Sequence, residues 1–222
     1  MIDMALQRKN MVESQVRPSD VTDRRILNAM LAVPREAFVP SGLKPLAYID
    51  EALTLVRAGA GVAARGMMAP RPFAKLLQLA EIEAGDVVLD IGCASGYSAA
   101  VISRLAQTVV ALESDSALAD LATKSLADLG ADNTAVVTGD LEVGYASEGP
   151  YDAIVIEGAI EQLPPVLLDQ LKDGGRLVAV AAGLPSHAVV WRRTGRLSDR
   201  RVAFEAAAPV LPGFERKFQF VF

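Results

Sequence analysis

The chain has 222 residues, of which 51% are hydrophobic and 22% are charged, a composition typical of a globular protein and not of a disordered chain. A formal net charge of −5 offers no broad cationic face for phosphates, so a nucleic acid is not an expected partner. One cysteine and one histidine leave no internal disulfide and no ordinary zinc site, and no apolar run approaches the roughly 20 residues of a membrane span. Because the N-terminus also lacks the apolar run of a signal peptide, we expect a cytoplasmic protein.

The first third of the sequence predicts helices followed by an irregular segment. In residues 1–33, a break at Pro18 separates two expected helices, and the second has an apolar stripe at helical spacing, formed by Ile26, Leu27, Met30 and Leu31. Prolines and glycines punctuate residues 40–70, which predicts a long irregular segment with short extended pieces. Long segments of this kind in a compact domain are usually functional or disordered.

From residue 70 onward, amphipathic segments alternate with short apolar ones. The amphipathic segments predict helices over residues 70–82, 96–106, 115–129 and 164–171. The apolar segments predict strands over residues 87–91, 108–113, 135–137, 153–156 and 177–180. Such alternation is typical of a parallel sheet covered by helices on both faces. Further strands at 188–193 and near Val202 and Phe218 suggest an antiparallel finish, within a single domain whose parts are residues 1–70, 71–183 and 184–222.

The segment Asp90–Tyr97, with the sequence DIGCASGY, joins the first apolar strand to the following helix. In such sheets, ligands bind outside the carboxyl ends of the strands, and glycines allow the backbone to approach them closely. A phosphate loop of the nucleoside triphosphatase type would need a Gly-Lys-Ser/Thr ending, which is missing. A dinucleotide loop would need three spaced glycines, and counted from Gly92 the last two positions hold Ala94 and Tyr97. S-adenosylmethionine is the third candidate ligand.

Acidic residues at the ends of successive strands favour S-adenosylmethionine. Asp90 lies at the end of the first strand, and Glu113 ends the second, where a carboxylate can accept hydrogen bonds from both ribose hydroxyls. Asp140 follows the third strand and is placed to meet the adenine amino group. An acidic rim suits a sulfonium cation better than a pyrophosphate. The predicted cofactor-binding residues are Asp90, Gly92, Ala94, Ser95, Gly96, Glu113, Ser114, Asp140 and Leu141.

Five separated segments carry further motifs. They are NMVESQVR at residues 10–17, VPREAFVP at 33–40, AYIDEAL at 47–53, the segment from Val88 to Tyr97, and GGRLV at 174–178. In order and spacing, they resemble the protein-L-isoaspartate O-methyltransferase family over residues 10–183. The resemblance implies a seven-stranded, mostly parallel, Rossmann-like methyltransferase sheet with an N-terminal helical cover. It also implies S-adenosylmethionine as methyl donor and, as acceptor, a protein or peptide carboxylate, the isoaspartyl side chain that arises in age-damaged proteins.

The resemblance assigns the acceptor site to Tyr48, Asp50, Met67, Met68 and Glu157. Met68 stands where the family has the serine of a Thr-Ile-Ser-x-Pro segment, and a thioether cannot donate a hydrogen bond to a carboxylate. Glu157 begins the stretch that replaces the family's Thr-Ala-Ala run, and its charge is expected to repel an incoming carboxylate. Ala94 replaces the middle glycine of the loop, a mild change for a backbone with negative φ. These departures predict an acceptor pocket poorly suited to isoaspartyl repair.

No catalytic residue is assigned, because a carboxylate acceptor is ionised at neutral pH and needs no general base. Three alternatives stay open: a methyltransferase with a different acceptor, a non-catalytic homologue that keeps the ligand and acts through partners, and a nicotinamide-dependent oxidoreductase. His187 and the arginines within residues 192–201 are given no function, since a rim histidine and a solvated hairpin explain them.

Overall fold

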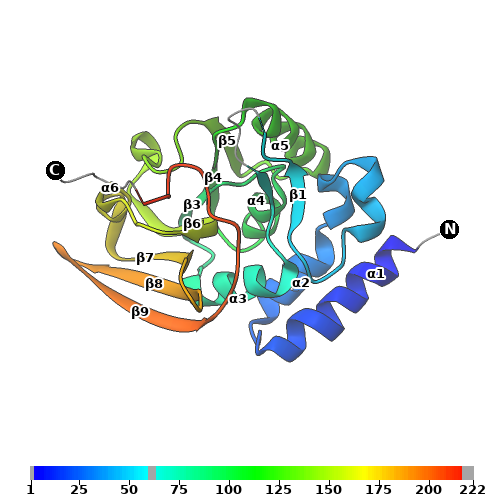
Figure 1. Cartoon of the computed structure of the whole chain (residues 1–222), viewed down its shortest axis with the longest axis horizontal. Helices are drawn as coiled ribbons and strands as arrows, with labels where there is room; N and C mark the ends of the chain where they lie inside the picture. The colour runs from blue at the N-terminus through cyan, green and yellow to red at the C-terminus, as the bar shows by residue number, and fades with distance from the viewer. Residues whose placement is uncertain (1–2, 60–63, 217–222) are drawn as a thin grey trace.

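A seven-stranded sheet forms the centre of the computed structural model, which describes residues 3–59 and 64–216 (Figure 1). Its strands lie in the order β5-β4-β3-β6-β7-β8-β9. Five of them are parallel: β3 (Val87–Ile91), β4 (Thr108–Glu113), β5 (Thr134–Thr138), β6 (Tyr151–Ile160) and β7 (Leu171–Ala181). At one edge, β8 (His187–Thr194) and β9 (Leu197–Glu205) add antiparallel strands. The expected mostly parallel sheet is confirmed.

The strand order reverses between β3 and β6. After β3 the chain builds outward through β4 to β5, and it then returns to place β6 on the other side of β3. Ligands of open α/β sheets bind at this kind of reversal, outside the carboxyl ends of the strands. Asp90 near the end of β3 and Glu113 at the end of β4 therefore lie at the edge where a ligand is expected.

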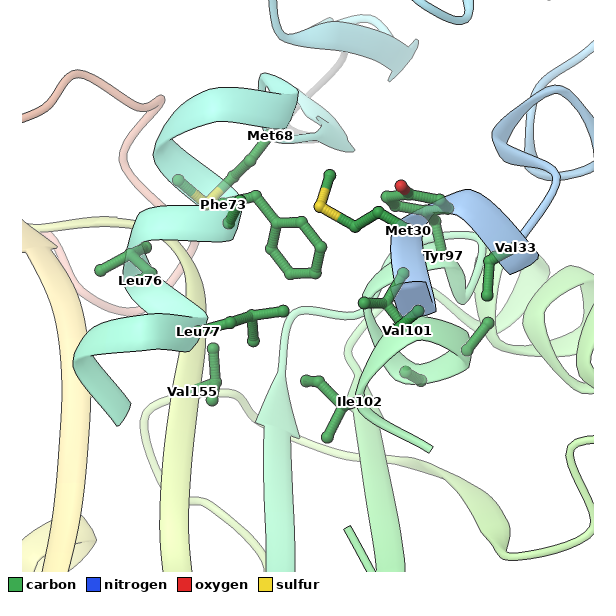
Figure 2. Packing of buried hydrophobic residues seen from close by; sticks show 14 of the residues in the cluster. Met30, Val33, Met68, Phe73, Leu76, Leu77, Tyr97, Val101, Ile102 and Val155 are labelled. Atoms are coloured by element: carbon green, nitrogen blue, oxygen red, sulfur yellow. The ribbon is translucent and has the colours of Figure 1, made fainter. Parts of the chain in front are cut away.

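Helices cover both faces of the sheet. One face carries α1 (Met4–Met11), α2 (Arg24–Ala32), α3 (Pro70–Ala80), α4 (Tyr97–Ile102) and α5 (Ser116–Leu129). Figure 2 shows this core from close by, where Phe73 of α3 lies near Met30 of α2 and Tyr97 of α4. The short helix α6 (Pro165–Asp169) packs on the opposite face. The predicted N-terminal helical cover is therefore present.

Some element boundaries differ from those expected. Helix α1 continues through a π-helical turn (Val12–Val16) and a 3-10 turn (Arg17–Ser19) before the chain breaks. Strands β6 and β7 extend beyond the apolar runs that predicted them, because their pairing continues past a register shift. The strand expected near Phe218 falls largely outside the described residues. No helix among residues 3–59 and 64–216 combines the length and apolarity that a membrane crossing requires.

Two segments outside the main sheet meet its carboxyl edge. The strands β1 (Leu53–Val56) and β2 (Arg65–Met67) pair in a separate two-stranded sheet, as expected of short extended pieces within residues 40–70. The segment after β9 runs back toward β6, where the Ala159 amide donates to the Pro209 carbonyl at 2.8 Å (Figure 1). The Ala159 carbonyl accepts from the Leu211 amide at 2.9 Å. Both segments thereby border the expected ligand site.

Candidate cofactor and acceptor site

The turn between β3 and α4 has the backbone that a glycine-rich ligand loop needs. Gly92 and Gly96 have φ angles of +82° and +95°, in the left-handed region that favours glycine. A Cβ atom on Gly96 would lie 3.1 Å from the Cβ of Ala122, so glycine also permits close packing of the loop on α5. Ala94 has a φ of +50°, so the negative φ that would make the replacement of glycine mild is not present. This conformation costs an L-residue roughly 1–2 kcal/mol.

Glu113 presents its carboxylate to this turn from the end of β4. Its Oε2 accepts a hydrogen bond from the Ala94 amide at 2.7 Å. Its Oε1 accepts from the amides of Ser114 at 2.9 Å and Asp115 at 3.1 Å. Backbone amides thus hold a buried anion in place at the position predicted to bind ribose.

Arg65, the first residue of β2, completes the surroundings of Glu113. Its Nη2 lies 2.5 Å from Glu113 Oε2 and its Nε lies 3.1 Å from Oε1, so the two side chains form a bidentate ion pair. The Arg65 side chain is 3% exposed and that of Glu113 is fully buried. No sequence motif singled out Arg65. The available signal was that it is the only charged residue in the small and apolar stretch of residues 58–70.

Asp90 is a second buried carboxyl group at this edge. Its Oδ2 accepts a hydrogen bond from the Ser98 hydroxyl at 2.7 Å, while Oδ1 has no partner among the described residues. Burial raises the pKa of Asp90 to about 7; the Ser98 hydrogen bond and Arg65 oppose this rise, and the Glu113 carboxylate adds to it. An unpartnered buried carboxyl oxygen at the end of β3 marks a place where a polar ligand group fits.

Two side chains fill the space above the glycine-rich turn. A Cβ atom placed on Gly92 would lie 3.0 Å from Leu211 Cδ1 and 3.2 Å from Arg65 Nη2. Leu211 belongs to the segment after β9 and is buried. Two neighbouring cavities measure about 30 Å³ and 10 Å³, room for little more than single water molecules. The polar groups predicted to hold a nucleoside therefore lie at this edge, and Arg65 and Leu211 pack against the turn beside them.

The remaining predicted cofactor residues differ in their access to solvent. Ser95 is buried, and its hydroxyl donates to the Phe38 carbonyl at 2.6 Å, which ties the turn to the N-terminal part of the chain. Asp140, in the turn after β5, is exposed, and so is Ser114 after β4. Leu141 is buried. The contacts of these residues with a cofactor stay predictions.

Glu157 lines both small cavities from an irregular stretch of β6. The register against β7 shifts between Val155 and Ala159, and irregularities of this kind re-aim side chains. Glu157 is buried, and its Oε1 has no partner among the described residues. Burial, and after it the nearby Asp90, raise the pKa of Glu157 well above its ordinary value. The expected repulsion of an acceptor carboxylate requires an ionised Glu157, and this shift favours the neutral acid.

Met67 and Met68 line the same cavities and are buried. Figure 2 shows Met68 beside Phe73 of α3. The Met68 carbonyl accepts a hydrogen bond from Nη2 of the buried Arg35 at 2.7 Å, and the Arg35 guanidinium lies 4.6 Å from the centroid of the Tyr97 ring. The two methionines therefore form an apolar wall between the core and the cavities.

Tyr48 and Asp50 are not among the residues that line these two cavities. The Tyr48 hydroxyl donates to the Glu36 carboxylate, and desolvation raises the pKa of Tyr48 above its ordinary value. Asp50 forms an ion pair with Arg71 at 3.0 Å. The structure thus brings the two methionines and Glu157 together but places Tyr48 and Asp50 in separate polar surroundings.

The groups at this edge fit the adenosine of S-adenosylmethionine in kind and in place. The unpartnered Asp90 Oδ1 and the amide-held Glu113 carboxylate are hydrogen-bond acceptors beside a glycine-rich turn at the strand reversal. A seven-stranded sheet of this topology with such a turn defines a Rossmann-like methyltransferase of class I.

Residues 6–208 match the family described as Protein-L-isoaspartate(D-aspartate) O-methyltransferase (PCMT). The protein-L-isoaspartate O-methyltransferase of Koribacter versatilis is 37% identical over 203 residues, which cover 89% of this chain and 87% of that protein. The one from Herpetosiphon aurantiacus is 43% identical over 175 residues, which cover 78% and 75%. The chain therefore belongs to the PCMT family.

Solved structures agree with this fold. A protein-L-isoaspartate O-methyltransferase structure, 26% identical, aligns with a TM-score of 0.81 over 93% of this chain and 66% of that chain. A Plasmodium falciparum structure assigned to the same family, in complex with S-adenosyl-L-homocysteine, is 20% identical. It aligns with a TM-score of 0.73 over 95% of this chain and 99% of its own, and at that identity it supports the fold alone.

Proposed function

We propose that the protein transfers a methyl group from S-adenosylmethionine to a carboxylate of a protein or peptide. The observation that carries this proposal is the buried Glu113 carboxylate, held by backbone amides beside the glycine-rich turn. A carboxylate there can accept hydrogen bonds from both ribose hydroxyls. Membership of a family whose named members are isoaspartate methyltransferases supports the acceptor class.

The bound cofactor would supply an electrophilic methyl group on a sulfonium sulfur. The residues of the chain supply position and environment. Glu113 and Asp140 would hold the adenosine, and the wall of Met67 and Met68 would exclude water from the reacting atoms. An ionised acceptor carboxylate needs no base, so alignment is the main requirement, and well-oriented reactants gain roughly 7–11 kcal/mol from it.

Met68 and Glu157 decide how well an isoaspartyl carboxylate can be held. Met68 offers no hydrogen-bond donor at the position where the PCMT family is expected to have a serine. Glu157 can donate one hydrogen bond while it is neutral and would repel the acceptor once ionised. We therefore infer that this protein methylates isoaspartyl peptides slowly.

Met68→Ser is expected to raise kcat/KM for an isoaspartyl peptide about ten- to a hundredfold, since a hydrogen bond to a charged group contributes about 1.5–3 kcal/mol. The assay follows labelled methyl transfer from S-adenosylmethionine to a synthetic isoaspartyl peptide, with the matching aspartyl peptide as substrate control. Met67→Ser makes the same chemical change one residue away and should give no increase.

An unchanged or lower rate for Met68→Ser would contradict the role given to Met68. Failure of the wild-type protein to bind S-adenosylhomocysteine would contradict the proposed function. Binding without methyl transfer to any carboxylate would instead favour a non-catalytic homologue that acts through partners.

A further inference from the structure

We propose that Arg65 is a built-in competitor of the cofactor: its guanidinium occupies the place of the ribose on Glu113 and leaves when the cofactor enters. Arg65 would then set the affinity for the cofactor by stabilising the ligand-free state. This role rests on the proposed function, because it takes Glu113 as the ribose-binding carboxylate.

Arg65 uses the hydrogen-bonding positions that a ribose would need. The guanidinium donates to both carboxylate oxygens of Glu113, at 2.5 Å and 3.1 Å. Its Nη2 also lies 3.2 Å from the position of a Cβ atom on Gly92, so it rests against the turn that would face the cofactor. A ribose presents two hydroxyl donors to the same two oxygens, and a guanidinium and a ribose cannot both occupy that volume.

The Glu113 carboxylate remains hydrogen-bonded when Arg65 leaves. The amides of Ala94, Ser114 and Asp115 still donate to it at 2.7–3.1 Å. Within residues 3–59 and 64–216, by contrast, the Arg65 guanidinium donates hydrogen bonds only to Glu113. A buried guanidinium that loses its counter-charge is unfavourable, so the displaced side chain should move into water. Two arrangements are thus self-consistent: Arg65 paired inside, or ribose on Glu113 with Arg65 in solvent.

The hairpin that carries Arg65 is separate from the main hydrogen-bonded sheet. Strands β1 and β2 pair with each other in a two-stranded sheet of their own. Arg65 is the end residue of β2, and Arg57, on the opposite arm of the hairpin, is exposed. Arg65 can therefore move outward without breaking any pairing among β3 to β9.

Calorimetric titration of the full chain with S-adenosylhomocysteine tests this role. Arg65→Ala is expected to bind about tenfold more tightly or better, because the ligand no longer has to displace a bound competitor. Arg65→Lys keeps the positive charge but loses the planar guanidinium that donates to both carboxylate oxygens. Its affinity for S-adenosylhomocysteine should therefore lie between those of the wild type and Arg65→Ala. Arg57→Ala removes the same charge from an exposed position of the same hairpin and should bind like the wild type.

Thermal unfolding supplies a second readout. Without ligand, Arg65→Ala should unfold at a lower temperature than the wild type, because the buried carboxylate has lost its partner. With saturating S-adenosylhomocysteine the two proteins should unfold at about the same temperature, because Arg65 makes no contact with Glu113 in the complex. Unchanged or weaker binding by both Arg65 variants, with a wild type that binds, would overturn the competitor role and leave the proposed function standing. No binding by any of the proteins would overturn both.

Discussion

Phe73→Ala is expected to lower the free energy of unfolding by about 3–5 kcal/mol, the usual cost of truncating a buried phenylalanine. Phe73 is 1% exposed, and its ring centroid lies 5.8 Å from that of Tyr97, the first residue of α4. Its ring points toward Met30 of α2 (Figure 2). Removing it would leave a cavity between α3 and α4, next to the proposed acceptor site. Denaturant unfolding followed by circular dichroism measures the change.

Phe204→Ala is the matched control for Phe73→Ala. Phe204 is a half-exposed aromatic residue of β9, and the Lys75 ammonium lies 4.4 Å from its ring centroid. Its loss removes this contact, worth about 0.5–1 kcal/mol, and part of its apolar packing, so it should cost about 1–2 kcal/mol, less than the loss of Phe73. Equal losses for the two variants would contradict the view that Phe73 anchors the core beneath the site.

We expect the free energy of unfolding of the Asp90→Asn variant to increase, relative to that of the wild type, as the pH rises. The native pKa of Asp90 is raised to about 7, whereas an unfolded aspartate has a pKa of about 3.9. Between these values the native protein holds a proton that the unfolded chain releases, so wild-type stability falls as the pH rises. The asparagine variant lacks this cost, and the difference in unfolding free energy should shift in its favour by about 2–4 kcal/mol from pH 4 to pH 8.

Unfolding curves at several pH values measure this shift. Asp120→Asn removes one carboxyl group from the exposed face of α5 and is the matched control. It should show no comparable pH-dependent difference from the wild type. A difference between Asp90→Asn and the wild type that stays constant across the pH range would contradict the raised pKa of Asp90.

The sheet and the glycine-rich turn were predictable because their signals are local. Short apolar runs between amphipathic segments indicate parallel strands. Asp90, Gly92 and Gly96 lie within one short stretch of sequence and together predict a ligand-binding loop. Glu113 was predictable because it ends the next apolar strand. Each of these predictions depends on residues near one another in the chain.

The occupants of the site could not be predicted in the same way. Arg65 and Glu113 are 48 residues apart, and no periodic pattern connects them. Leu211 reaches the Gly92 turn from the segment after β9, where the sequence carries no ligand motif. The protonation of Glu157 depends on its burial, because the sequence shows the carboxyl group but not the buried surroundings that raise its pKa. Contacts between residues far apart in the sequence therefore determine which side chains lie beside the turn and how deeply Glu157 is buried, and local motifs do not reveal such contacts.

A crystal structure of the chain with bound S-adenosylhomocysteine tests the central claim most directly. We expect the ribose hydroxyls on the Glu113 carboxylate, the adenosine at the carboxyl edge of β3 to β5, and the Arg65 guanidinium displaced from Glu113. Ligand bound at a different place, or a bound ligand beside an intact Arg65–Glu113 pair, would contradict this claim.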